Sequence, residues 1–370
     1  MANYLVSIVG NQTLPNILPI KEFESRMDKY IFIYTGKVRS ELTWIKKVCN
    51  LTNDVVIDLK VHEDDLNDIN IKLSTMNSIL SDSDNVFVNL TGGTKIMALG
   101  TFEYFTKIIS KTNMFYLNMG SNVLRQVYPV VDEERRDTKI EYRVNVKEFL
   151  GAYGTEINNF NDVNSLCKDK EYTELFYKNK WSQKYNRIIS KLRDYINEFE
   201  KDILFDRTKE ELLNEIQVFI SVTSFPLKNH DRLTKNEIRY LIGGWWEEYC
   251  YNYIKEKFAL SDSYINIGIQ NSKTNNELDV IFVKDNVLYV FECKTTVFKK
   301  DDFEDYIYKL SAIKDNQNGF GIGVKAYLVT NRFKSVAGTK GIDPTFKRRA
   351  SAFNITLVDA KVLDRGNLAI

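Results

Sequence analysis

The sequence has few of the residues that mark a stapled or fibrous protein. It contains 4 cysteines, 5 prolines and 17 glycines in 370 residues. The cysteines, Cys49, Cys167, Cys250 and Cys293, form no C-x-x-C pair, so neither a zinc site nor a disulfide framework is indicated. With 44% hydrophobic residues, the composition also excludes a collagen-like repeat and extensive disorder. We therefore expect packed cores throughout the chain.

Long apolar runs are missing as well. No stretch approaches the ~18 consecutive apolar residues that a membrane-spanning helix needs. The first residues, MANYLVSIVGNQT, include neither a cationic leader nor a small-residue cleavage site, and are interpreted as a buried strand. Together with the sparse cysteines, these absences predict a cytoplasmic protein that has no membrane partner.

The sequence also lacks a large excess of positive or negative charge. The formal net charge is +1, so the charge of the whole chain does not indicate a nucleic-acid partner. Locally, the segment from Phe320 to Ile370 has nine Lys or Arg against three Asp, a net charge of +6. Alone, this excess is as consistent with an ordinary solvated face as with a nucleic-acid surface.

The length predicts more than one domain, because a single hydrophobic core stops growing below that size. Residues 1–154 alternate short β-branched or aromatic runs with helical periods. The expected strands cover 4–10, 29–36, 54–61, 85–90 and 113–118, and the expected helices cover 40–50, 64–80 and 94–109. This alternation predicts a Rossmann-like α/β domain with a parallel, doubly wound sheet.

The pattern changes after this domain. Residues 155–233 carry apolar side chains at spacings of three and four, and we interpret them as a helical connector whose aromatic stripe forms core or interface. Residues 234–370 predict a compact α/β domain. Its expected elements are a helix at 235–258, strands at 264–270, 278–284 and 287–294, a helix at 301–314, and strands at 325–330 and 355–358.

Charged residues stand at the ends of two buried strands of this last domain. Asp279 begins one strand, and Glu292-Cys293-Lys294 ends the next after the tight connection 284–286. A hairpin brings the two segments together, and side chains two apart on a strand share a face. Glu292 and Lys294 therefore point the same way, while Cys293 points away. Because a buried carboxylate is costly without a partner, two carboxylates and an ammonium are expected to converge.

Such a set meets the needs of metal-dependent phosphodiester hydrolysis. Oxygen ligands hold Mg²⁺ or Mn²⁺ and leave coordination positions for water and phosphate. Asp279 and Glu292 are the expected metal ligands, with the backbone carbonyl of Cys293 as a third. Lys294 is expected to position the attacking water or to offset charge on the phosphate.

This arrangement resembles the pattern of the PD-(D/E)xK nucleases, although Leu278 replaces the usual proline before Asp279. The resemblance implies a restriction-endonuclease-like fold and a further glutamate from the preceding helix. Glu247 and Glu248 are the candidates, and Glu247 is favoured. The predicted catalytic residues are Glu247, Asp279, Glu292 and Lys294.

Two segments of the first domain lie beyond the carboxyl ends of its strands, where doubly wound sheets bind ligands. Residues 10–16 (GNQTLPN) follow the first strand, and residues 89–95 (NLTGGTK) join the fourth strand to its helix. Backbone N–H groups at glycines and at a helix start favour an anion. The spacing matches neither the P-loop nor G-x-G-x-x-G, and a turn that caps a helix with Thr94 is the simpler alternative.

Upstream of a nuclease motif, N-L-T-G-G-T-K resembles the signature loop of CARF domains, the CRISPR-associated Rossmann-fold sensors, and residues 146–154 (VKEFLGAYG) resemble the end of that domain. The whole chain resembles the CRISPR ancillary nucleases of type III systems, with one CARF and one PD-(D/E)xK domain. Residues 119–122 are expected to complete the ligand pocket. The resemblance implies that the ligand contacts Gln12, Thr13, Leu14, Thr35, Gly36, Arg39, Thr91, Gly92, Gly93, Thr94 and Lys95.

Members of that family are homodimers that bind cyclic tetra-adenylate across the CARF dimer and then degrade nucleic acid. A two-fold ligand on a two-fold axis lets each subunit read half of it. The expected function is a nuclease activated by cyclic tetra-adenylate that cuts RNA and/or DNA, single strands favoured, in antiviral defence. Lys95 and the Gly92-Gly93 backbone are expected to pass movement into the helix at 94–109.

Two other functions remain open from the residues alone. A restriction-type DNA endonuclease without a link to CRISPR would use the same catalytic set. A CARF regulator that binds nucleic acid without cutting would have no use for it, and the intact Asp279, Glu292 and Lys294 argue against that function.

Overall fold

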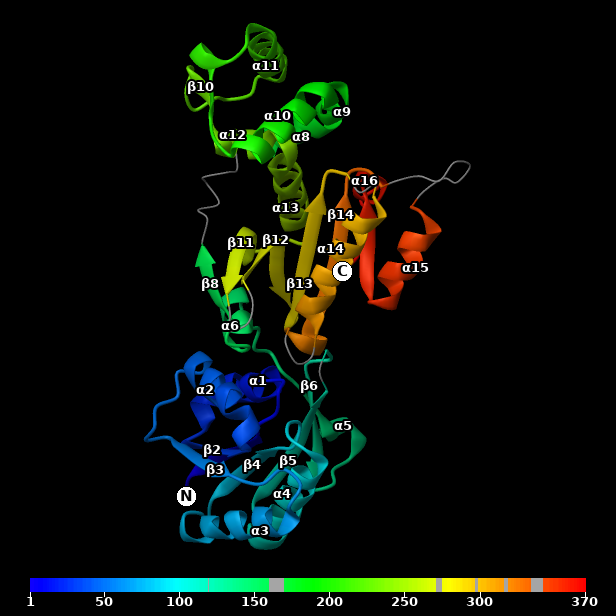
Figure 1. Ribbon diagram of the computed structural model, residues 1–370. Helices are drawn as coiled ribbons and strands as arrows, with labels where there is room; N and C mark the ends of the chain where they lie inside the picture. Colours follow the sequence, from blue (N-terminus) through cyan, green and yellow to red (C-terminus); the bar gives the residue numbers. More distant parts are fainter. Residues whose placement is uncertain (119, 160–169, 271–274, 297–298, 316–318, 334–341) are drawn as a thin grey trace.

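The computed structural model describes residues 1–118, 120–159, 170–270, 275–296, 299–315, 319–333 and 342–370. Within these residues the chain forms one sheet of seven strands near the N-terminus and one of six strands in the C-terminal half (Figure 1). A group of helices, which we call the helical cap, lies on the second sheet at the end remote from the first domain (Figure 1). No helix in the described ranges is both long enough and apolar enough to cross a membrane.

The first sheet has the strand order β3-β2-β1-β4-β5-β6-β7. The predicted parallel arrangement is confirmed for β1 to β5, whereas β6 and β7 pair antiparallel and make the sheet mixed. Sequence analysis missed these two strands, because β6 follows β5 through a tight turn and β7 is fully exposed, without an apolar pattern. The strands are β1 (Asn3–Ile8), β2 (Lys29–Tyr34), β3 (Val56–Lys60), β4 (Asn85–Asn89), β5 (Thr112–Asn118), β6 (Val123–Tyr128) and β7 (Asp137–Lys139).

Helices cover both faces of this sheet, since successive strand residues point to opposite sides. Leu5 packs with α1 and α2, and Val6 with α3 and α4. Sequence analysis missed α1 because it contains Pro15 and Pro19, but proline is tolerated in a first turn, where Pro15 lies. The helices are α1 (Leu14–Phe23), α2 (Arg39–Val48), α3 (Leu66–Ser74), α4 (Lys95–Ile108), α5 (Glu133–Arg136) and α6 (Val146–Gly151).

The second sheet has the order β15-β14-β13-β12-β11-β8. The antiparallel trio β11, β12 and β13 is as expected, and β14 and β15 run parallel to β13. The range predicted as a helical connector begins with a strand, β8, which pairs with β11 at the edge of this sheet. The strands are β8 (Glu156–Asn159), β11 (Ser263–Gln270), β12 (Asn275–Lys284), β13 (Val287–Lys294), β14 (Val324–Thr330) and β15 (Ile355–Asp359). The helices α14 (Lys300–Lys314), α15 (Pro344–Ala352) and α16 (Ala360–Asp364) complete this part.

The helical cap shares a hydrophobic core with one face of the second sheet. Phe176, Leu192, Trp245 and Trp246 lie in a cluster that also contains Phe291 of β13. The helix predicted at 235–258 is interrupted by a π-turn at Tyr240–Gly244. The cap contains α8 (Lys170–Lys178), α9 (Trp181–Lys184), α10 (Asn186–Phe199), α11 (Glu210–Thr223) and α12 (Lys235–Arg239), the short strands β9 (Ile203–Leu204) and β10 (Arg232–Leu233), and α13 (Trp245–Lys257), which continues down to the sheet.

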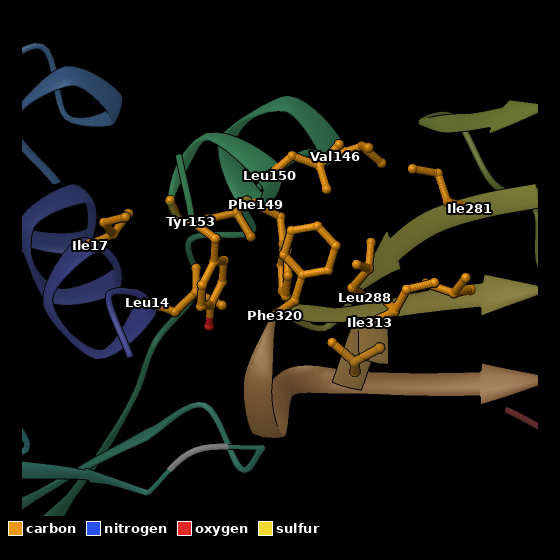
Figure 2. Close-up of a cluster of buried hydrophobic side chains, with 14 of the residues drawn as sticks. Leu14, Ile17, Val146, Phe149, Leu150, Tyr153, Ile281, Leu288, Ile313 and Phe320 are labelled. Atoms are coloured by element: carbon orange, nitrogen blue, oxygen red, sulfur yellow. The ribbon is translucent and has the colours of Figure 1, made fainter. Parts of the chain in front are cut away.

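An apolar cluster joins the first domain to the second. Figure 2 shows Phe149 and Tyr153, from α6 and the turn after it, between Leu14 of α1 on one side and Phe320 and Leu288 on the other. The Phe320 ring contacts both Phe149 and Tyr153, with ring centroids 6.3 and 5.7 Å apart. These side chains are all buried, so the two domains are packed together.

The turn between β12 and β13 adds a polar anchor to this interface. Asp285 and Asn286 adopt φ of 52° and 62°, which gives the tight hairpin expected for 284–286. The Asn286 side chain is buried, and its Oδ1 accepts the Val144 N–H at 2.9 Å. Its Nδ2 donates to Asn122 Oδ1 at 2.9 Å and to the Tyr142 carbonyl at 3.1 Å. The hairpin that carries the predicted catalytic residues is thus fixed to the first domain at its turn.

Candidate active site and ligand pocket

Three of the predicted catalytic residues converge at the ends of β12 and β13. Lys294 Nζ lies 3.0 Å from Asp279 Oδ2 and 2.7 Å from Glu292 Oε1. Asp279 Oδ2 also accepts the backbone N–H of Cys293 at 2.7 Å. The Cys293 side chain points to the opposite face, into the core that the sheet shares with the cap. The alternation read from the sequence is therefore correct, while a metal bond from the Cys293 carbonyl stays a prediction.

Burial and charge both act on this cluster. Asp279 and Glu292 are 5% and 3% exposed, too little for surface carboxylates. Burial raises the pKa of Asp279, and the nearby negative charge of Glu292 raises it further, against the opposing charges of Lys294 and Lys309. Burial lowers the pKa of Lys294, but its carboxylate neighbours outweigh that effect and the pKa is raised overall. The lysine is therefore held fully protonated.

The two candidate glutamates on α13, Glu247 and Glu248, lie in different surroundings. Glu248 is buried in the cap, where its Oε2 accepts the Tyr240 hydroxyl at 2.7 Å. Burial raises the pKa of Glu247 to about 8, with a further upward effect of Asp279 and an opposing effect of Lys294. Glu247 therefore lies within electrostatic reach of the converging residues, and Glu248 is occupied elsewhere.

The structure adds a second lysine that sequence analysis did not single out. Lys309, on α14, donates to Glu292 Oε2 at 2.6 Å, so each oxygen of Glu292 has its own ammonium partner. Tyr306, one turn earlier, lies under the Lys294 ammonium, 5.4 Å from the ring centroid. Both residues lie on a helix that follows the motif strand, and no local pattern distinguishes Lys309 from the other lysines of that helix.

The donor set suits a hard divalent cation only after a rearrangement. Among the described residues, no three His, Cys, Asp or Glu side chains are arranged to hold a metal ion. The carboxylates of Asp279 and Glu292 are instead paired with ammonium groups. Buried carboxylate oxygens are the ligands that Mg²⁺ and Mn²⁺ prefer, so the residues fit such an ion if Glu292 exchanges a lysine for it.

The first domain contains a pocket of about 380 Å³ beyond the carboxyl ends of β1, β2 and β4. Gly92 and Gly93 pack so closely on β1 that a Cβ at either would lie 2.1 or 2.3 Å from Ile8. Thr94 caps α4 by accepting the Met97 N–H at 3.2 Å. The predicted ligand residues that line this pocket are Gln12, Thr35, Thr91, Gly92, Gly93 and Thr94. Asn11, from the predicted segment 10–16, also lines it, and sequence analysis missed Lys37, Glu63 and Met97.

Five predicted ligand residues are not among the pocket's lining. Thr13 and Leu14 are fully buried, and the Thr13 hydroxyl donates to the Ala152 carbonyl at 2.5 Å. Their side chains therefore belong to the core, and a contact of either residue with the ligand stays a prediction. Gly36, Arg39 and Lys95 lie beside the pocket and are exposed. Of the segment 119–122, Met119 lies outside the described residues.

Gln12 links this pocket to the second domain. Its Oε1 accepts the Tyr153 hydroxyl at 3.0 Å. Its amide also packs on Gly321, where an added Cβ would lie 2.3 Å from Gln12 Nε2 and Oε1. Gly321 belongs to the turn between α14 and β14, so the same side chain lines the pocket and contacts the turn that follows the helix carrying Lys309.

Solved structures of similar fold cover nearly the whole chain. Can2 from Sulfobacillus thermosulfidooxidans, solved with cyclic tetra-adenylate, has a TM-score of 0.74 and 22% identity over 98% of each chain. VC1899 from Vibrio cholerae has a TM-score of 0.74 and 19% identity, over 99% of this chain and 96% of its own. A type III CRISPR defence DNA nuclease activated by cyclic oligoadenylate has a TM-score of 0.57 and 14% identity, over 95% of this chain and 52% of its own. No curated protein matches the sequence.

Two protein families match separate parts of the chain. The Card1 CARF domain family matches residues 4–149. The family of Card1-like endonuclease domains matches residues 234–346, which include the converging Asp279, Glu292 and Lys294. The chain therefore belongs to the CARF-domain nucleases, with a Card1-type CARF domain followed by a Card1-like endonuclease domain.

Proposed function

We propose that this protein is a Mn²⁺- or Mg²⁺-dependent nuclease that cuts RNA and/or DNA when a cyclic oligoadenylate occupies its CARF pocket. The observation that carries the proposal is the position of Lys294, whose ammonium lies between two buried carboxylates inside an endonuclease domain. A functionally silent E-x-K on a surface strand would be exposed to water. Here the two carboxylates are withdrawn from water at the ends of neighbouring strands, where only pairing with a cation or a ligand makes their burial tolerable.

In the proposed mechanism, Asp279 and Glu292 would hold the metal ion, together with the Cys293 carbonyl. The bound metal would acidify the attacking water and offset charge on the phosphate. Lys294 lies on the same strand face as Glu292, with its proton firmly retained, so it acts as a cation that orients the water or contacts the scissile phosphate. Glu247, on α13, adds a third carboxyl group within electrostatic reach of Asp279 and Lys294.

The CARF pocket has donor groups that can bind the phosphates of a nucleotide and the acceptor atoms of its bases. The N-terminus of α4 and the glycines before it offer backbone N–H groups, and Lys37, which pairs with Glu63 at 2.5 Å, supplies an ammonium. Can2, which shares the fold, was solved with cyclic tetra-adenylate, and this ligand is our proposed activator. Because a cyclic tetramer has two-fold symmetry, we propose that two copies of the chain bind it together, each with the same pocket.

The proposed signal from pocket to active site passes through the interdomain contacts. Gln12 lines the pocket and packs on Gly321, and α14, which ends shortly before that glycine, carries Lys309 against Glu292. A ligand that moves Gln12 thus acts on the helix that contacts the catalytic carboxylate. By contrast, α4, the helix predicted to receive the signal from Lys95, packs mainly on α3.

The nuclease activity is tested with labelled single-stranded RNA, single-stranded DNA and plasmid. With cyclic tetra-adenylate present, we expect cleavage in Mn²⁺ or Mg²⁺ and none in chelator. Asp279→Asn should abolish cleavage, because it weakens a metal ligand while keeping an oxygen for the Cys293 N–H. The matched control is Asp301→Asn, an exposed residue at the start of α14. Full activity of Asp279→Asn would overturn the assignment of the site.

A further inference from the structure

A second cavity lies next to the proposed catalytic residues. It has a volume of about 330 Å³ and lies between the helical cap and the carboxyl ends of β13 and β14. One wall comes from α9 and α10 of the cap, and another from the residues that directly follow the two strands. Because it contains two arginines, Arg193 and Arg332, we call this cavity the arginine groove.

The groove has a composition that suits the backbone of a nucleic-acid strand. Among the described residues that line it, the ionisable side chains are Arg193 and Arg332, which are both cationic. Amides and hydroxyls make up most of the remainder, among them Gln183, Asn186 and Thr296. Arginine, serine, threonine, asparagine and glutamine side chains supply most contacts to phosphates and sugars in protein–nucleic acid complexes. The positive charge of the groove thus contrasts with the carboxylates of Asp279 and Glu292 in the proposed active site.

The groove is lined by residues next to Lys294 in the chain and in the sheet. Thr295, which lines it, follows Lys294 directly in the chain. On the neighbouring strand, the Asn331 N–H donates to the Lys294 carbonyl at 3.4 Å, and Asn331 also lines the groove. One residue of an extended strand spans ~3.3 Å, so the groove begins about one residue beyond the backbone of Lys294.

We propose that the arginine groove binds the nucleotides of the substrate strand adjacent to the scissile phosphate, mainly through their phosphates and sugars. This proposal rests on the proposed nuclease function and assigns the substrate-binding site to the helical cap. The segment that sequence analysis interpreted as a connector then forms one side of the path along which the strand reaches Lys294. With two arginines and mostly amides and hydroxyls among its described lining residues, the groove is suited to hold a strand by its phosphates and sugars rather than by its base sequence.

The test compares two neutralisations on the same helix. Arg193 lines the groove, whereas Arg187, also on α10, is outside it and pairs with Glu215 at 3.3 Å. Binding of a fluorescent single strand to the full chain with cyclic tetra-adenylate is measured in Ca²⁺ over a range of salt concentrations. Loss of one phosphate contact should reduce the slope of log K against log salt by about 0.7, which corresponds to roughly fivefold weaker binding at 0.1 M salt. We expect this change in Arg193→Gln and not in Arg187→Gln.

A second variant separates the groove from a structural effect, because Arg193 also donates to the Ile242 carbonyl at 3.4 Å. Asn186→Ala removes a groove amide on an exposed position of α10. It should raise KM for a long strand severalfold with little change in kcat. Unchanged binding and KM in both Arg193→Gln and Asn186→Ala, while the wild type cuts, would overturn the groove and leave the nuclease proposal intact. A wild type that cuts no nucleic acid under any condition would instead overturn the nuclease proposal itself.

Discussion

Two lysines balance two buried carboxylates at the proposed active site. Lys294 bridges Asp279 and Glu292, and Lys309 takes the second oxygen of Glu292. The two ammonium groups offset the charges of the two carboxylates, which makes the burial of these carboxylates tolerable without a metal. A divalent cation that enters this site must compete with an ammonium for Glu292, and the displaced ammonium is then available to a phosphate.

This competition gives Lys309 a testable role. Lys309→Met keeps the length of the side chain but removes its charge, so metal affinity should stay equal or increase while turnover falls by more than tenfold. Lys309→Arg should restore part of the turnover. Metal affinity is measured by calorimetry and turnover by cleavage of a labelled strand, with Lys300→Met at the exposed start of α14 as the control. A loss of metal affinity in Lys309→Met would contradict this role.

The raised pKa of Glu247 predicts how stability depends on pH. The pKa rises from 4.5 to about 8 on folding, so the folded, metal-free protein retains a proton that the unfolded chain releases in this interval. The free energy of unfolding therefore falls as the pH rises from about 4.5 to about 8. Glu247→Gln should make that fall shallower. Urea unfolding in chelator at several pH values tests this, and Glu256→Gln, on the exposed face of the same helix, should behave as the wild type. An equal slope for Glu247→Gln would refute the prediction.

At the scale of elements, the β12–β13 hairpin joins the domain interface to the active site. Its turn is fixed to the CARF domain through Asn286, and six residues further along β13 lies Glu292, ~20 Å away at ~3.3 Å per residue. A second connection runs from Gln12 through Gly321 to α14. The β12–β13 hairpin carries Glu292, and α14 contacts Glu292 through Lys309, so both connections lead from the interface to the same carboxylate.

Gly321 offers a test of the second connection. It adopts φ of +70°, and a Cβ there would lie 2.3 Å from the Gln12 amide, so Gly321→Ala must displace Gln12 or the turn. We expect the cyclic tetra-adenylate concentration for half-maximal activation to rise at least tenfold. Gly366→Ala is the matched control, because Gly366 has φ of +64° and no atom within 4 Å of its added Cβ. A similar response of both variants in a ligand titration of cleavage would exclude a specific role of the Gln12 contact.

The elements also show what the sequence could and could not predict. Alternating side chains on β12 and β13 predicted the convergence of Asp279, Glu292 and Lys294, because strand periodicity is local and the hairpin is short. Lys309 could not be predicted, because its contact with Glu292 depends on how α14 packs on the sheet, and no local sequence pattern encodes that packing. Thr13 was predicted to contact the ligand because its segment resembles that of CARF domains. Its hydroxyl instead donates to the carbonyl of Ala152, 139 residues away. Pocket residues such as Lys37 and Glu63 come from other loops, and only the folded sheet brings them to the glycines.

For the whole molecule, we expect a homodimer. If the pocket binds half of a two-fold ligand, as proposed above, a second copy is needed to enclose it. Light scattering at micromolar concentration, with and without cyclic tetra-adenylate, measures the mass directly. A mass of two chains is expected in the presence of the ligand, and one chain under both conditions would contradict the proposed ligand geometry.

The packed interface between the domains implies that the ligand acts by shifting a population. A non-specific nuclease that is always active would damage its host, so we expect an almost silent ligand-free form. A ligand that prefers the active form about a hundredfold supplies roughly 2.7 kcal/mol, enough to bring a 1:99 population to about even. An increase in rate of about fiftyfold is therefore the scale of activation to expect.

The most direct test of the account is the rate at which the wild-type protein cuts a labelled single strand in Mn²⁺, with and without cyclic tetra-adenylate. The account predicts near-silence without the ligand, an increase of about fiftyfold with it, and no cleavage at either ligand level for Asp279→Asn. Equal rates of the wild type with and without the ligand would contradict it, and would make the protein a constitutive endonuclease instead.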